Sequence, residues 1–104
     1  MNDVRDLRFS VLDKEEVSAL LLLPSRATSL LVLAHGAGAG MSHSFMSTIA
    51  NRLAADGVAT FRYQFPYMEQ KSGVPDKQPL LTATVAAAVA IAAQLAPDLP
   101  LFAG

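Results

Sequence analysis

The stretch Leu30-Leu31-Val32-Leu33-Ala34-His35-Gly36-Ala37-Gly38-Ala39-Gly40 decides the fold, because an unbroken apolar run passes directly into a glycine-rich turn. An apolar run without alternation is typical of a central strand that is covered on both faces of a sheet. From Ser44 the apolar period becomes that of a helix, and Gly57 can take the left-handed conformation that ends it. Val58–Phe61 then predicts another buried strand. The stretch therefore opens a strand-helix-strand unit, and such crossovers are almost always right-handed and parallel.

The flanking segments extend this unit on both sides. Val4–Leu12 and Val17–Leu23 predict two strands joined by a short polar turn, which makes an antiparallel hairpin the natural arrangement. After a long loop over Arg62–Gln78, Pro79–Leu95 predicts an alanine-rich helix, and Leu101–Ala103 predicts one more buried strand. We therefore expect residues 1–104 to form a single α/β domain. It would be a three-layer α/β/α sandwich, with the hairpin followed by a parallel β-α-β-α-β unit.

Composition limits the classes of function. The chain has 52% hydrophobic and 16% charged residues and a formal net charge of -1, and its Lys and Arg residues are scattered. Nucleic acid is therefore not an expected partner. There is no cysteine, which leaves no disulfide and no thiolate metal site. The mixed-charge N-terminus does not resemble a signal peptide, so the expected location is the cytoplasm. The apolar run Leu80–Ala96 is shorter than the ~20 residues of a membrane span, and no membrane partner is expected.

The glycine-rich turn has two functional interpretations. As a phosphate or dinucleotide cradle, G-x-G-x-x-G would require glycine where the chain has Met41 or His43, and no Walker lysine is present. As an oxyanion hole, the turn would present fixed backbone N–H donors to a carbonyl oxygen that becomes negative during acyl transfer. The residues favour the second interpretation.

Three motifs carry a resemblance to a known family. They are His35-Gly36-Ala37-Gly38, Met41-x-His43-x-Phe45-Met46 and Phe61-Arg62-Tyr63-x-Phe65-Pro66-Tyr67. Together they resemble the dienelactone-hydrolase-like branch of the α/β-hydrolase superfamily. Within that branch the sequence is similar to small predicted hydrolases of the testis-expressed protein 30 type and to the hydrolase-like part of a KANSL-type chromatin subunit. The resemblance covers about residues 15–104.

The resemblance implies roles for particular residues. The backbone N–H of Ala37 would be the first oxyanion donor, and His35, Gly36 and Gly38 would shape the turn that presents it. In the family, the strand equivalent to Pro100–Ala103 runs into the nucleophile elbow G-x-S-x-G, with the acid and the histidine much later in the chain. We therefore expect the truncated N-terminal half of a serine esterase or peptidase, without its three catalytic side chains and inactive alone.

The chain's own residues do not suggest another catalytic centre. His35 and His43 are the only histidines, and the serines near them are Ser42, Ser44 and Ser47. Neighbours in sequence do not face each other on a helix, and no carboxylate lies nearby to complete a triad. His35 is better explained by hydrogen bonds within the turn and His43 by capping of the helix. No metal and no cofactor are expected.

The aromatic run after Phe61 also has two interpretations. Tyr63, Phe65 and Tyr67, with Met41, could line a substrate pocket, or the three rings could anchor the loop on the sheet.

Two further expectations concern partners. An ester-like small molecule would be the substrate only if a C-terminal half completed the site. Apolar Leu101 and Phe102 in an edge strand predict a homo-oligomer or a complementing chain. A non-catalytic scaffold module and, less favoured, a nucleotide-binding domain stay open as alternative functions.

Overall fold

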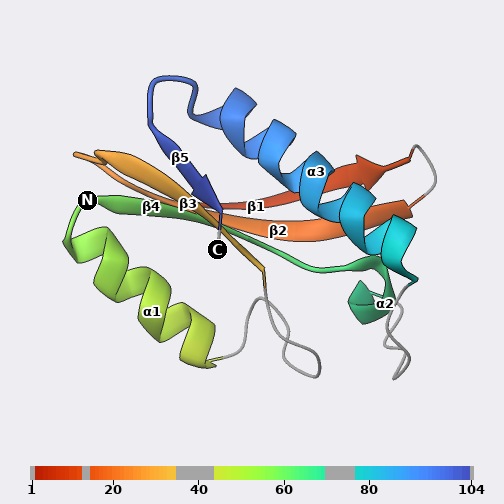
Figure 1. The fold of residues 1–104 in the computed structure, drawn as a ribbon. Coiled ribbons are helices and arrows are strands. Elements are labelled where there is room, and N and C mark those ends of the chain that lie inside the picture. Colours follow the sequence, from red (N-terminus) through yellow and green to blue (C-terminus); the bar gives the residue numbers. More distant parts are fainter. Residues whose placement is uncertain (1, 13–14, 35–43, 70–76, 104) are drawn as a thin grey trace.

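A computed structural model describes residues 2–12, 15–34, 44–69 and 77–103 of the chain. In these parts five strands form one mixed sheet in the order β1-β2-β4-β3-β5 (Figure 1). The strands are β1 (Asn2–Val11), β2 (Glu15–Pro24), β3 (Ser29–Ala34), β4 (Val58–Tyr63) and β5 (Leu101–Ala103). β1 and β5 therefore lie at the two edges.

The helices cover opposite faces of this sheet. α1 (Ser44–Ala55) packs on β4 and β2, and α3 (Gln78–Leu95) packs on β1 and β3 from the other side (Figure 1). The short α2 (Pro66–Glu69) packs against β2. The predicted three-layer α/β/α arrangement is confirmed.

Strand register follows the apolar pattern. β1 and β2 form the expected antiparallel hairpin, in which Phe9 lies opposite Val17. β2 and β4 are also antiparallel, whereas β3 runs parallel to both β4 and β5. Because side chains alternate between the faces of a strand, this register places every second residue of the central strands on the α3 side. The predicted hairpin and parallel β-α-β-α-β unit are confirmed.

The larger core lies between the sheet and α3. Thr84, Ala88 and Ala92 are the buried residues of α3, and their small side chains let the helix approach the strands closely. By length and composition alone α3 could cross a membrane, with a mean hydropathy of 1.5 and 17% of its residues buried. The sheet side of this core contains the following buried residues: Phe9, Val11, Val17, Ala19, Leu21, Leu30, Val32, Ala59, Phe61 and Tyr63.

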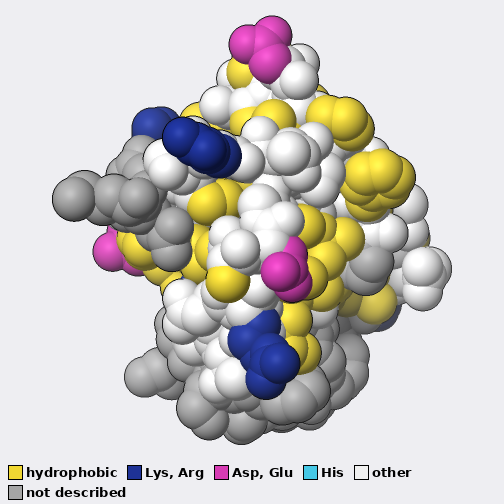
Figure 2. All heavy atoms as spheres, turned by 90° about the vertical axis from the view of Figure 1, so that its left-hand side faces the viewer, with side chains coloured by type: hydrophobic (Ala, Val, Ile, Leu, Met, Phe, Trp, Pro, Cys, Tyr) yellow, Lys and Arg dark blue, Asp and Glu magenta, His cyan; other side chains and the backbone are white. Residues whose placement is uncertain are grey.

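The smaller core lies under α1. It joins Leu22 of β2 to Ala50 and Ala54 of the helix. The exposed side chains of Asn51, Arg52 and Ala55 lie on the opposite side of α1, as its periodicity predicts. On the face of the molecule in Figure 2, hydrophobic patches alternate with separate basic and acidic side chains.

Two sequence predictions about the segment after Phe61 were wrong. β4 continues through Arg62 and Tyr63, because these residues pair with Leu33 and Ala34 of β3. The sequence pattern had predicted both residues in a loop. The predicted loop also contains the helical turn α2, and residues 70–76 lie outside the described residues. The helix end was predicted correctly, since Gly57 has a φ of 83°.

Candidate functional site

The candidate site lies where the parallel strands β3 and β4 end. Ala34 and Tyr63, the last residues of these strands, are paired in the ladder, so both carboxyl ends reach the same edge of the sheet. Ligands of open parallel sheets bind beyond such ends. The predicted turn residues His35, Gly36, Ala37, Gly38 and Met41 follow Ala34 directly and lie outside the described residues. Their assigned roles therefore stay predictions, but the positions where the turn leaves β3 and enters α1 are known.

The aromatic residues predicted to line a pocket lie together at this edge. The ring centroids of Tyr63 and Phe65 are 5.6 Å apart in an edge-to-face arrangement, and those of Phe65 and Tyr67 are 6.2 Å apart and stacked. Tyr63 is only 2% exposed and also contacts Phe9 and Phe61 in the α3-side core. Tyr63 and Tyr67 are therefore packed as the anchoring interpretation requires, while a pocket-lining role for these rings stays a prediction.

Burial also shifts the ionisation of Tyr63 to higher pH. Desolvation raises the pKa of its phenol above the ordinary range, because the low-dielectric surroundings disfavour the phenolate. Like an ordinary tyrosine, Tyr63 is neutral at physiological pH and keeps a hydroxyl that can donate a hydrogen bond, and its burial extends this state to higher pH.

A buried arginine is the feature of this edge that was not predicted from the sequence. Arg62 is 6% exposed, and its Nη1 donates a hydrogen bond to Oγ of Ser47 in the first turn of α1 at 3.1 Å. Burial lowers the pKa of the guanidinium, which nevertheless stays charged at neutral pH. A sequence signal existed: Thr60 and Arg62 alternate with Ala59, Phe61 and Tyr63, which extends the period-two pattern of the strand.

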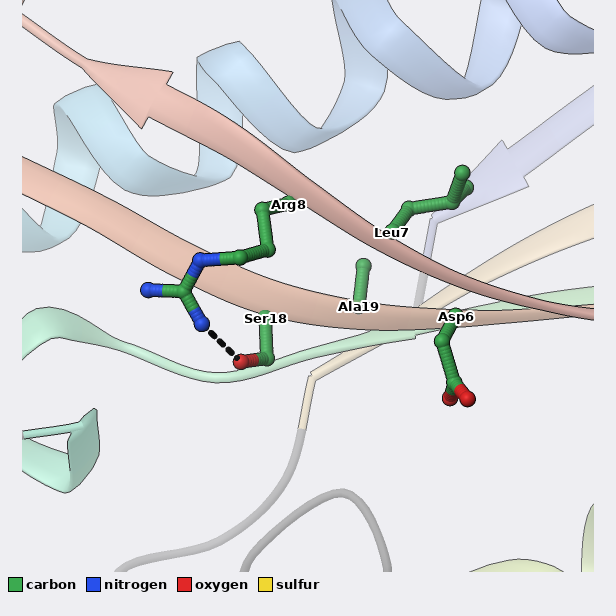
Figure 3. Close-up of a pocket in the computed structure, with 5 residues that line it drawn as sticks. All are labelled: Asp6, Leu7, Arg8, Ser18 and Ala19. Carbon is green, nitrogen blue, oxygen red and sulfur yellow. Dashed lines mark hydrogen bonds between the residues drawn. The ribbon is translucent and has the colours of Figure 1, made fainter.

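A separate depression of about 370 Å³ lies on the β1–β2 hairpin. Figure 3 shows Asp6, Arg8 and Ser18 pointing to one side of the hairpin, with Leu7 and Ala19 on the other. Arg8 Nη1 donates to Ser18 Oγ at 2.9 Å, and Arg8 Nε lies 2.6 Å from a carboxylate oxygen of Glu16. Both members of this ion pair are more than half exposed, so it contributes about 0–1 kcal/mol to stability. All five lining residues come from β1 and β2, so this depression is distinct from the predicted site.

The described part of the chain offers little for a metal. Within residues 2–12, 15–34, 44–69 and 77–103, no three His, Cys, Asp or Glu side chains gather in a possible metal site. The described residues at this edge include the buried cation Arg62 and the neutral buried phenol Tyr63. They also include the end of β3 and the start of α1, between which the glycine-rich turn lies. Such an arrangement can position backbone N–H donors but holds no described nucleophile–base pair.

Comparison with solved structures supports the fold. The dienelactone hydrolase from Anabaena variabilis superposes with a TM-score of 0.81 at 18% identity, covering 98% of this chain and 50% of the hydrolase. A cold-adapted esterase from an Arctic intertidal metagenomic library gives a TM-score of 0.77 at 16% identity, with 98% and 49% of the two chains covered. An alpha-beta serine hydrolase homologue from Coxiella burnetii gives 0.75 at 13% identity, with 95% and 50% covered. The chain thus spans about half the length of these structures.

Sequence comparison identifies the family. No curated protein matches the chain at a significant level. The sequence model of the family described as "Alpha/beta hydrolase domain" matches residues 27–104, which include the glycine-rich turn and every element from β3 to β5. Because this match covers most of the chain and agrees with the parallel β3–β4–β5 topology, the chain belongs to the α/β-hydrolase family.

Proposed function

We propose that this chain carries the oxyanion-hole turn of a serine hydrolase that acts on esters or related acyl compounds. The observation that supports this most directly is the position at which β3 ends, beside the end of β4. The segment His35-Gly36-Ala37-Gly38 begins at the residue after Ala34, where β3 and β4 end side by side. In this fold the N–H after such a strand donates to the carbonyl oxygen under attack, so Ala37 is the proposed donor. His35, Gly36 and Gly38 are proposed to shape the turn.

The chemistry of this role needs only the backbone. When a nucleophile adds to an ester carbonyl, the π electrons move to the oxygen, which becomes an alkoxide. An N–H group that is already aimed at this oxygen needs no reorganisation, and losing one such donor slows catalysis by about 10²–10³-fold. We further propose that the nucleophile, the acid and the catalytic histidine are not among the 104 residues, so the chain is inactive alone.

An ester hydrolysis assay tests the second part of the proposal. The purified chain should hydrolyse p-nitrophenyl acetate no faster than heat-denatured chain, because the described residues contain no nucleophile–base pair. Ser42→Ala, Ser44→Ala and Ser47→Ala serve as controls for the three serines that follow the turn. Turnover by the wild-type chain that any one of these substitutions abolishes would refute the proposal that the nucleophile is missing.

Anion binding tests the oxyanion turn itself. Methylphosphonate imitates a tetrahedral oxyanion and can be titrated into ¹⁵N-labelled chain while amide shifts are followed by NMR. The Ala37 amide should show the largest shift change, and Ala37→Pro, which removes that N–H, should weaken binding more than the matched control Ala39→Pro. Equal effects of the two prolines would argue against Ala37 as the donor.

We also propose that the β5 edge is a surface for association with another copy or a complementing chain. Three observations support this. β5 lies at a sheet edge, its three residues carry no charge, and the side chain of Phe102 is 59% exposed. β1, at the other edge, carries Arg5, Asp6 and Arg8, which are the kind of charges that discourage edge-to-edge pairing.

A further inference from the structure

The inference concerns Arg62, the buried cation on the α1 side of the sheet. Ala59, Phe61 and Tyr63 of β4 pack in the core with α3, so the alternation of a strand directs Thr60 and Arg62 to the opposite face. A buried guanidinium is costly unless its N–H groups are hydrogen-bonded. Arg62 makes such a bond to Ser47 of α1. The bond is thus a specific link between β4 and the first turn of the helix.

The backbone of Arg62 is fixed by the sheet on both sides. It lies opposite Leu33 of β3 and opposite Leu20 of β2. Leu33 precedes Ala34, the last residue before the connection over residues 35–43, and Ser47 is the fourth residue of α1. Arg62 therefore contacts the chain just before this connection through its backbone and just after it through its side chain.

The described apolar contacts of α1 with the sheet include small side chains. Among the side chains of α1 that the structure describes, from Met46 to Ala55, the buried ones are Met46, Ala50 and Ala54. Alanine methyl groups offer few interlocking contacts, and cores of small side chains specify position less sharply than well-shaped large ones. Buried polar contacts can supply that specificity. The Arg62–Ser47 bond lies at the end of α1 that faces the proposed site.

We propose that Arg62 is a positioning residue: by holding Ser47 it fixes the first turn of α1 relative to the carboxyl end of β3. It thereby sets the separation between the two ends of the connection that carries the proposed oxyanion donor. The catalytic meaning of this role rests on the proposed function, whereas the positioning of α1 stands independently. Arg62 itself does not touch the reacting atoms.

The first test is amide hydrogen exchange measured by NMR on the whole chain. The variants are Arg62→Met, Arg62→Lys and Ser47→Ala, with Arg52→Met as the matched control, because Arg52 is exposed in the last turn of the same helix. The amides of residues 48–50 bond to carbonyls of the first turn and report its opening. Loss of a charge-assisted bond should raise their exchange about tenfold in Arg62→Met and Ser47→Ala. The amides of residues 53–55 should change less.

Equal acceleration at 48–50 and 53–55 would overturn the proposal, because it would indicate general destabilisation. Arg62→Lys keeps the charge without the planar fork and should restore part of the protection. If Arg62→Met fails to fold, Ser47→Ala and Arg62→Lys decide the question alone, since both are small changes.

The second test links position to the proposed site. Methylphosphonate affinity at the Ala37 amide should fall at least severalfold in Arg62→Met and recover partly in Arg62→Lys, with Arg52→Met unchanged. Unaltered affinity in Arg62→Met would refute the link to the oxyanion turn. If the wild-type chain binds no methylphosphonate, the proposed function fails, and the exchange measurement alone decides whether Arg62 positions α1.

Discussion

Thr60 and Thr84 provide a paired experiment in which one substitution should have opposite effects. Both side chains are fully buried, at 0% exposure. The hydroxyl of Thr84 donates to the carbonyl of Leu80 at 2.7 Å within α3. The hydroxyl of Thr60, in β4, has no hydrogen-bond partner and lies opposite the apolar Leu22 and Leu31 in the sheet register. Replacing threonine by valine keeps the branched shape and removes only the hydroxyl.

The magnitudes follow from these two environments. A buried donor or acceptor without a partner costs about 1–3 kcal/mol, so Thr60→Val should stabilise the protein by about 1 kcal/mol or more. A satisfied hydrogen bond contributes about 0.5–1.5 kcal/mol, so Thr84→Val should destabilise the protein by about 1 kcal/mol. In a domain of this size each kcal/mol moves the midpoint of thermal unfolding by about 4–8 °C. The two variants should therefore melt on opposite sides of wild type.

Urea unfolding followed by far-UV circular dichroism measures both effects. An unchanged m-value in each variant would show that only stability changed, and not the surface exposed on unfolding. If Thr60→Val lowers stability as much as Thr84→Val does, the hydroxyl of Thr60 must be hydrogen-bonded, and the reasoning about this strand is wrong.

Three further predictions use other described residues. Gly57→Ala should cost about 1 kcal/mol, because φ is 83°, a conformation that residues with a Cβ rarely adopt. Thermal unfolding should show a smaller loss for Gly57→Asn, and equal losses would contradict the conformational argument. Ultraviolet titration should show Tyr63 ionising above the ordinary range, and a Tyr63→Phe control should lack that step. Because the folded pKa of Tyr63 is raised, its contribution to stability is complete below about pH 10, the unfolded value, and is lost as pH rises further. Phe102, 59% exposed on β5, should drive concentration-dependent association in light scattering, and Phe102→Ser should weaken it; wild type that stays monomeric at every concentration would count against this surface.

Most of the architecture follows from local patterns in the chain. Alternation in β1, the unbroken apolar run of β3 and the helical stripe of α1 each predict an element whose position the structure confirms. Gly57 marks the end of α1 because a left-handed residue is needed there. These signals are local, so sequence spacing alone carries them.

The end of β4 was not predicted correctly from the local sequence pattern. The prolines Pro66 and Pro75 and the glycine and charges near them suggested a loop from Arg62 onward, since proline and glycine are uncommon inside a central strand. The ladder with β3 and β2 extends the strand to Tyr63, and α1 covers the charge. Pairing between distant segments outweighs local propensity here.

The sequence by itself determined the family, the order of the elements and the glycine-rich turn that makes a hydrolase the proposed function, because motifs and periodicity are properties of neighbouring residues. Only the tertiary structure decided that Arg62 is buried against Ser47, that Thr60 lacks a hydrogen-bond partner and that Phe102 is exposed at an edge. Each of these facts depends on which strands and helices meet across long stretches of chain. Side chains acquire their environment only when that packing is complete.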